Sequence, residues 1–111
     1  MDRLISADGQ TGTIPTLLRN TKARASRVIY AGYHRSGGLG SAYDRCADEL
    51  TIIEARIAKL AASTPGLEFA DMRTVFPRRD RTYYDTDLIH PSIKGAGAYA
   101  AQLADVIRRR N

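Results

Sequence analysis

The sequence contains little of what several classes of protein need. It has one cysteine, Cys46, which excludes an intrachain disulfide, and only two histidines, and no group of Cys and His has the spacing of a zinc site. No apolar run approaches the length that spans a membrane. The sequence therefore indicates no metal or other cofactor and no membrane-spanning segment.

The composition predicts a folded chain. The chain has 111 residues, of which 43% are hydrophobic, enough for one domain over residues 1–111 with a packed core. The net charge of +5 raises the alternative of a nucleic-acid-binding domain. However, the arginines gather at 78–81 and 108–110, without interleaved aromatic side chains that would stack on bases, so no nucleic-acid partner is expected.

The first two thirds of the chain carry the pattern of a βαβ unit. A short helix is expected around Pro15, and the β-branched and aromatic stretch 27–33 (RVIYAGY) predicts a strand covered on both faces. Apolar residues at helical spacing over 43–61 predict a long helix, which Pro65 and the following glycine end. A second strand is expected over 67–71 (LEFAD). A strand, helix and strand in this order imply parallel strands in an α/β sheet.

Two helix starts carry capping signals. Ser41 followed by Asp44 predicts a variant of the capping box at the start of the long helix. Ser92, after Pro91, predicts the start of a last helix that runs to about Arg109. The apolar side chains expected to be buried by this last helix are Ile93, Ala96, Ala100, Leu103, Val106 and Ile107.

The stretch 85–95 (DTDLIHPSIKG) carries the chemistry that is most specific in this chain. Asp87 precedes His90 by three residues, so its carboxylate can reach the near ring nitrogen, fix the imidazole tautomer and leave the other nitrogen available as a base. Asp85 is a second candidate carboxylate, but the three-residue spacing favours Asp87. The alternative is a surface turn in which the aspartate caps the backbone and the histidine is solvated.

The residues Asp87, His90, Pro91, Ser92 and Gly95, followed by an amphipathic helix, resemble the C-terminal block of the SGNH (GDSL-type) serine ester hydrolases. With the preceding elements, the resemblance covers about residues 13–110. It implies a flavodoxin-like three-layer α/β/α sandwich that hydrolyses carboxylic esters of small molecules. By this resemblance, His90 is the general base and then the general acid, and Asp87 is its orienting partner.

The sequence departs from this family in its first part. No stretch matches the family's nucleophile block, its glycine block or its Gly-x-Asn-Asp stretch, and Ser6, Ser36 and Ser41 lie in unsuitable contexts for a nucleophile. The family's N-terminal strands have no counterpart either. The chain is therefore expected to be the C-terminal portion of such a domain. It would supply the His and Asp but not the nucleophilic Ser or oxyanion hole, and it would be inactive alone.

Missing strands would leave an open sheet edge and uncovered helix faces. The chain is therefore expected to associate with itself or with a complementing N-terminal half. An alternative function is a non-catalytic, self-associating fragment or interaction module. Tyr33 and His34 follow the first predicted strand, where side chains at the edge of a sheet can bind substrate, although a polar loop is the alternative there.

Overall fold

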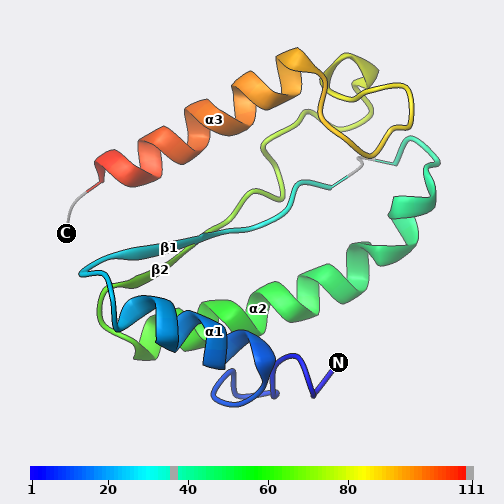
Figure 1. The fold of residues 1–111 in the computed structure, drawn as a ribbon. Coiled ribbons are helices and arrows are strands. Elements are labelled where there is room, and N and C mark those ends of the chain that lie inside the picture. The colour runs from blue at the N-terminus through cyan, green and yellow to red at the C-terminus, as the bar shows by residue number, and fades with distance from the viewer. Residues whose placement is uncertain (36–37, 110–111) are drawn as a thin grey trace. The chain divides into compact units, whose positions relative to one another are not determined.

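A computed structural model describes residues 1–35 and 38–109, and Figure 1 shows its ribbon. These residues form three α-helices and two strands, and β1 and β2 pair in parallel. The mixed helix and strand composition and the parallel βαβ order confirm the α/β prediction at this level. No helix among the described residues is long and apolar enough to cross a membrane. The elements in chain order are α1 (Thr13–Lys22), β1 (Val28–Ala31), η1 (Ala42–Cys46, a 3-10 helix), α2 (Ala47–Ser63), β2 (Leu67–Ala70), η2 (Arg81–Tyr83, a 3-10 helix) and α3 (Ile93–Arg108).

The chain divides into two compact units. Unit 1 consists of Met1–Tyr30 and Glu49–Phe69, and unit 2 consists of Ala31–Asp48 and Ala70–Asn111. Unit 1 contains α1, most of α2 and most of the two strands. Unit 2 contains η1, η2 and α3 with the loops between them, and both residues of the Asp87 and His90 pair belong to it.

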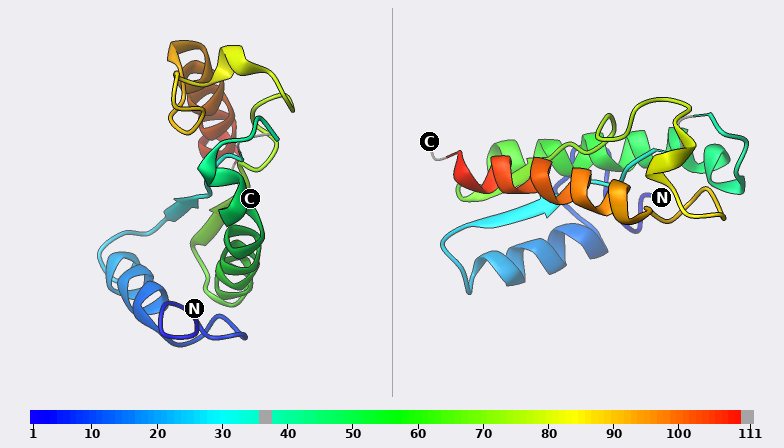
Figure 2. Two further views of the ribbon diagram at one scale, coloured as in Figure 1. Left: turned by 90° about the vertical axis from the view of Figure 1, so that its right-hand side faces the viewer. Right: turned by 90° about the horizontal axis from the view of Figure 1, so that it is seen from above.

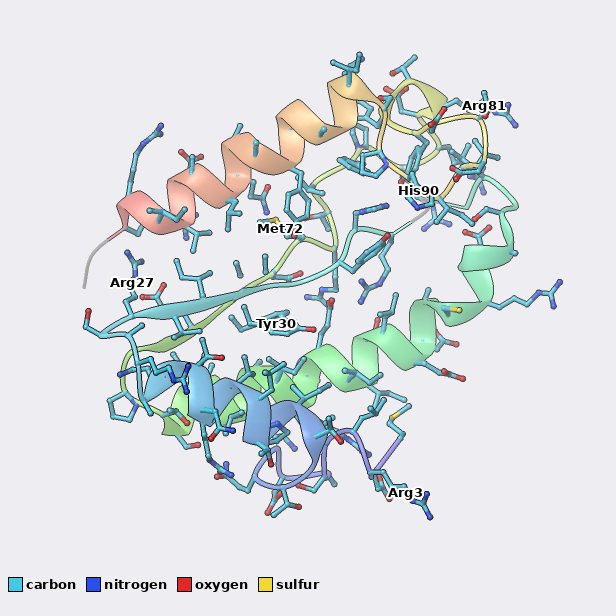
Figure 3. The ribbon with its side chains drawn as sticks, in the orientation of Figure 1. Arg3, Arg27, Tyr30, Met72, Arg81 and His90 are labelled. Atoms are coloured by element: carbon cyan, nitrogen blue, oxygen red, sulfur yellow. The ribbon has the colours of Figure 1, made fainter. Side chains whose placement is uncertain are left out.

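Unit 1 has the hydrophobic core that the apolar spacing predicts. α1 and α2 lie on one side of the two strands (Figures 1 and 2). The rings of Tyr30 and Phe69 stack with centroids 6.3 Å apart, and Figure 3 shows Tyr30 on the helix side of β1. Burial of these apolar side chains supplies the main driving force for folding this unit. The fully or nearly fully buried side chains are Ile5, Leu18, Ile57, Leu60 and Leu67.

Two expectations for this part of the chain are wrong. Every residue of β1 is only half-buried, so neither face of the strand is fully covered. The helix expected from residue 43 begins as the 3-10 helix η1, and the Ser41 side chain makes no cap hydrogen bond. The Asp44 carboxylate instead accepts from the backbone N–H of Gly40 at 2.8 Å, which bends the loop before η1 rather than closing a capping box.

The start of α3 follows the prediction. The Ser92 hydroxyl oxygen accepts from the backbone N–H of Gly95 at 3.1 Å and caps the helix. Gly95 and Tyr99 are four residues apart and therefore share the face of α3 that contacts the rest of unit 2. Gly95 is the only described residue of α3 that is fully buried.

The burial expected for the apolar side of α3 is wrong. Ile93 lies two residues before Gly95, which places it on the opposite side of the helix, and it is 95% exposed. Ala96 and Ala100 are exposed as well, Ile107 is 51% exposed, and Leu103 and Val106 are half-buried. The apolar stripe correctly predicted a helix, but none of its side chains is fully buried.

Gly95 and Gly97 provide a matched test of the packing that holds the start of α3. A Cβ atom at Gly95 would lie 2.1 Å from the carbonyl oxygen of Tyr83, whereas one at Gly97 would meet nothing within 4 Å. We expect Gly95→Ala to lower the free energy of unfolding by about 1–3 kcal/mol, because the helix must move away from Tyr83. Gly97→Ala should raise it by roughly 0.5–1 kcal/mol. Urea denaturation measures both changes, and equal stabilities would contradict this packing.

Candidate functional site

A tight loop before α3 carries the predicted histidine. The backbone N–H of Asp85 donates to the carbonyl of His90 at 2.7 Å, and that of Leu88 donates to the carbonyl of Asp85 at 2.9 Å. An antiparallel bridge between Tyr84 and Pro91 closes the loop. Leu88 has a φ of 59°, a left-handed conformation that tightens the turn. Figure 3 shows His90 on this loop.

Asp87 and His90 contact each other as their spacing predicts. Asp87 Oδ2 lies 2.5 Å from His90 Nδ1, while Asp87 Oδ1 accepts from the backbone N–H groups of Ile89 at 2.9 Å and His90 at 3.0 Å. The carboxylate is therefore fixed on both oxygens. Asp85 instead accepts from the N–H of Thr86 at 2.8 Å, so Asp87 is the partner of the ring.

The electrostatics of the pair favour charge on both members. The hydrogen bond from His90, helped by the two backbone N–H donors, lowers the pKa of Asp87 to about 2. The same hydrogen bond and the negative charge of Asp87 raise the pKa of His90. When the imidazole is neutral, its proton sits on Nδ1 toward Asp87, and Nε2 carries the lone pair. The His90 side chain is 70% exposed and no described residue hydrogen-bonds Nε2, so this nitrogen is accessible to a reactant.

The second histidine has a different role in the structure. His34 is 3% exposed, and its Nε2 donates to the carbonyl of Ile89 at 2.7 Å, one residue before His90. Burial lowers the pKa of His34, so the ring stays neutral near pH 7 and keeps its proton for this bond. The rings of Tyr33 and Phe76 flank it, with centroids 4.4 and 4.8 Å away. His34 thus ties the segment after β1 to the loop of the candidate base.

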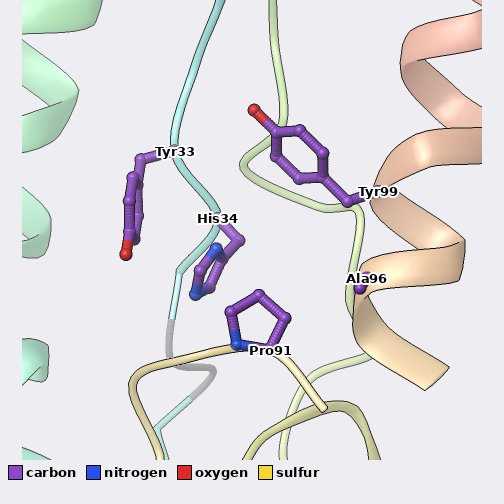
Figure 4. Close-up of a pocket in the computed structure, with 5 residues that line it drawn as sticks. All are labelled: Tyr33, His34, Pro91, Ala96 and Tyr99. Atoms are coloured by element: carbon purple, nitrogen blue, oxygen red, sulfur yellow. The ribbon is translucent and has the colours of Figure 1, made fainter. Parts of the chain in front are cut away.

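Tyr33 and His34 also line a pocket of about 260 Å³ within unit 2. Figure 4 shows their rings face to face on one side, with Pro91 and the residues of α3 across from them. The Tyr99 hydroxyl donates to the carbonyl of Gly32 at 2.8 Å and so holds α3 against the segment after β1. The two predicted substrate residues therefore lie beside Pro91, the residue after His90, and a substrate role for them remains a prediction. The remaining lining residue is Ala96.

No hydrogen bond joins the hydroxyl of a described serine to Nε2 of His90. The Ser6 hydroxyl donates to Asp8 Oδ1 at 2.6 Å and accepts from the N–H of Thr11, within a loop of unit 1. The Ser41 hydroxyl is buried without a partner among the described residues. Ser36, the third candidate, lies outside the described residues. In the described parts of the chain, no three Cys, His, Asp or Glu side chains gather as metal ligands.

Two aromatic residues support the site without having been predicted from the sequence. The Tyr84 hydroxyl donates to the carbonyl of Arg35, and Phe76 packs against Tyr84 edge to face with centroids 5.3 Å apart. Both are buried in a stretch whose proline and arginines indicate a loop. The aromatic residues of that stretch were the available signal, because buried aromatic side chains commonly anchor such segments.

Comparison with known proteins found no protein similar to this chain. No family model matches the chain, and neither the curated proteins nor the solved structures include a significant match. The function therefore has to be inferred from the residues and their geometry.

Asp87→Asn and Asp85→Asn together test the origin of the His90 electrostatics. We expect Asp87→Asn to lower the pKa of His90 toward its ordinary value of 6.5, because the main cause of its elevation is removed. Asp85→Asn should lower it less, since Asp85 acts only through its charge at a distance. NMR titration of the imidazole proton signals measures both shifts. Equal shifts in the two variants would show that Asp87 is not the specific partner.

The pair also sets a pH window for its contribution to stability. The lowered pKa of Asp87 gives a contribution that is present above 3.8 and lost as the pH falls toward about 2. The raised pKa of His90 gives one that is complete below 6.5 and lost as the pH rises through the pKa in the folded state. The charged pair therefore stabilises the loop most at mildly acidic pH.

Proposed function

We propose that this chain supplies the general base and its orienting carboxylate to a carboxylic ester hydrolase of the Ser-His-Asp type. The observation that carries the proposal is the contact between Asp87 Oδ2 and His90 Nδ1, with Nε2 left open to solvent. Few side chains change protonation near neutral pH, and an imidazole oriented in this way is suited to moving one proton in each direction. The resemblance of residues 87–95 to the SGNH hydrolases points to the same chemistry.

In the proposed reaction, Nε2 of His90 accepts the proton of a serine hydroxyl while the serine oxygen attacks the ester carbonyl carbon. Asp87 stabilises the imidazolium that forms. When the tetrahedral intermediate collapses, Nε2 returns the proton to the departing alkoxide, which leaves as the alcohol. Water then attacks the acyl-enzyme, with His90 again accepting and returning a proton, and releases the carboxylic acid.

We further propose that β1, α2, β2 and α3 form part of a flavodoxin-like three-layer sandwich. The parallel pairing of β1 and β2 through α2 supports this architecture. Tyr33 and His34 follow the carboxyl end of β1, which is the edge where open α/β sheets bind ligands.

The nucleophile and the oxyanion donors are proposed to come from outside the described residues. Ser6 belongs to its own loop, and the hydroxyl of Ser92 caps α3 and donates to the carbonyl of Thr82 at 2.6 Å. A complementing polypeptide would bring a serine to the exposed Nε2 of His90. A serine of this chain is the alternative.

Ester hydrolysis by the chain alone and by its native assembly tests the proposed function. Alone, the chain should hydrolyse p-nitrophenyl acetate no faster than free imidazole, because a base without a nucleophile or oxyanion hole stabilises little of the transition state. The assembly isolated from the producing cells should react with a serine-directed phosphonate. There, His90→Ala should lower the hydrolysis rate by roughly 10²–10⁴-fold.

The labelled peptide identifies where the serine comes from. A label on a partner polypeptide supports a complementing half, and a label on a serine of this chain would move the nucleophile into this chain. The rate should rise as the pH passes through the raised pKa of His90, because only the neutral imidazole accepts a proton. Equal rates for the wild type and His90→Ala in the native assembly would refute the proposed role of His90.

Self-association is a second candidate function, favoured by the exposed side of α3. Ile93 is 95% exposed and Ile107 is 51% exposed, on a helix whose expected buried stripe is only half-buried or exposed. Exposed apolar side chains on one helix can contribute to a contact surface when a partner covers them. We expect light scattering to show a molecular mass that increases with concentration, and Ile93→Asp to reduce this increase. A monomer at all concentrations would remove this candidate.

A further inference from the structure

The pocket of about 260 Å³ is lined by Pro91, the residue that follows the candidate base in the chain. Pro91 forms part of its wall, and a trans peptide bond places the Cα atoms of His90 and Pro91 about 3.8 Å apart. His34, which also lines the pocket, donates to the carbonyl of Ile89, so both neighbours of His90 in the chain are tied to the pocket wall. A group bound there would have its attachment point near the loop that carries the base.

We propose that this pocket binds one compact apolar substituent of the ester, such as a phenyl ring or a chain of about four carbons, while the carbonyl group stays at His90. That the bound molecule is an ester rests on the proposed function. The binding of a compact apolar group rests on the pocket itself.

The size of the pocket selects a small group. A protein cavity of about 150 Å³ holds benzene, and pockets for drug-sized ligands begin at about 300 Å³. A volume of about 260 Å³ lies between these sizes, so it fits a ring or a short branched or linear chain. A long fatty acyl chain would extend out of it.

The chemistry of the walls selects an apolar group. Among the described residues, no Lys, Arg, Asp or Glu side chain lines the pocket, so a charged substituent would lose its hydration without gaining a partner there. The Tyr99 hydroxyl is hydrogen-bonded to the carbonyl of Gly32, and Nε2 of His34 to the carbonyl of Ile89. What these side chains, Pro91 and Ala96 offer a ligand is mainly ring faces and methyl or methylene groups.

Binding can be measured without any reaction, using amides that resemble esters but resist hydrolysis. The probes are N-methylpentanamide, with a butyl group on the acyl side, and N-butylacetamide, with a butyl group on the side of the leaving group. We expect at least one to shift the NMR signals of His34, Ala96 and Tyr99 saturably, with a dissociation constant on the order of millimolar. The tighter probe identifies which side of the ester enters the pocket. The anion N-methylsuccinamate should not bind.

Ala96→Leu and Ala100→Leu form a matched pair of variants for this test. Both positions are exposed on α3 and one helical turn apart, but only Ala96 lines the pocket. Ala96→Leu should fill the pocket and weaken binding of the tighter probe by about tenfold or more, whereas Ala100→Leu should leave it unchanged. Ala96→Val serves if the leucine variant does not fold.

The proposal is overturned if neither amide binds, if Ala96→Leu and Ala100→Leu bind alike, or if the anion binds as well as the amides. Because no ester is cleaved in this experiment, its result is separate from that of the proposed function. If an amide binds saturably but His90→Ala leaves the hydrolysis rate of the native assembly unchanged, the pocket is a ligand site and the proposed hydrolase function is refuted. If hydrolysis requires His90 but neither amide binds, the proposed function stands and the proposed role of the pocket does not.

Discussion

The hydrogen bond from the buried His34 ring to the carbonyl of Ile89 is the contact on which the candidate site depends. It joins two segments that are 55 residues apart in the sequence, and the rings of Tyr33 and Phe76 keep it away from water. A buried polar group that loses its partner costs about 1–3 kcal/mol, so the loop is held strongly at this point. This bond holds the loop that carries His90 and the pocket residue Pro91, and within that loop Asp87 orients the His90 ring.

Asp87 shows that a structural turn and a chemical site are not exclusive. Its Oδ1 accepts two backbone N–H groups and shapes the loop, as a turn-forming aspartate does. Its Oδ2 contacts the imidazole of His90 and sets the tautomer that leaves Nε2 as the base. The backbone bonds prevent the carboxylate from rotating away, so the turn itself provides the preorganisation that a proton-transfer site needs.

The features that the sequence predicted are those determined locally. The spacing of Asp87 and His90 needs only one turn to bring them together, and the order of strand, long helix and strand implies parallel pairing. The exposure of Ile93 depends on which face of α3 meets Tyr83, and that is decided by the close approach at Gly95. The bond of His34 likewise depends on how distant segments fold back together, so no spacing pattern indicates it.

The solvent exposure of the pair connects the chemistry to the need for a partner. With the His90 side chain 70% exposed, water screens its attraction to Asp87, and an exposed ion pair of this kind contributes little by itself. Displacing that water would lower the local dielectric constant and strengthen the hold of Asp87 on the imidazolium. A polypeptide that brings a serine hydroxyl to Nε2 would also cover the pair. In the proposed hydrolase, the nucleophile and the water exclusion that the base requires would therefore arrive in the same step.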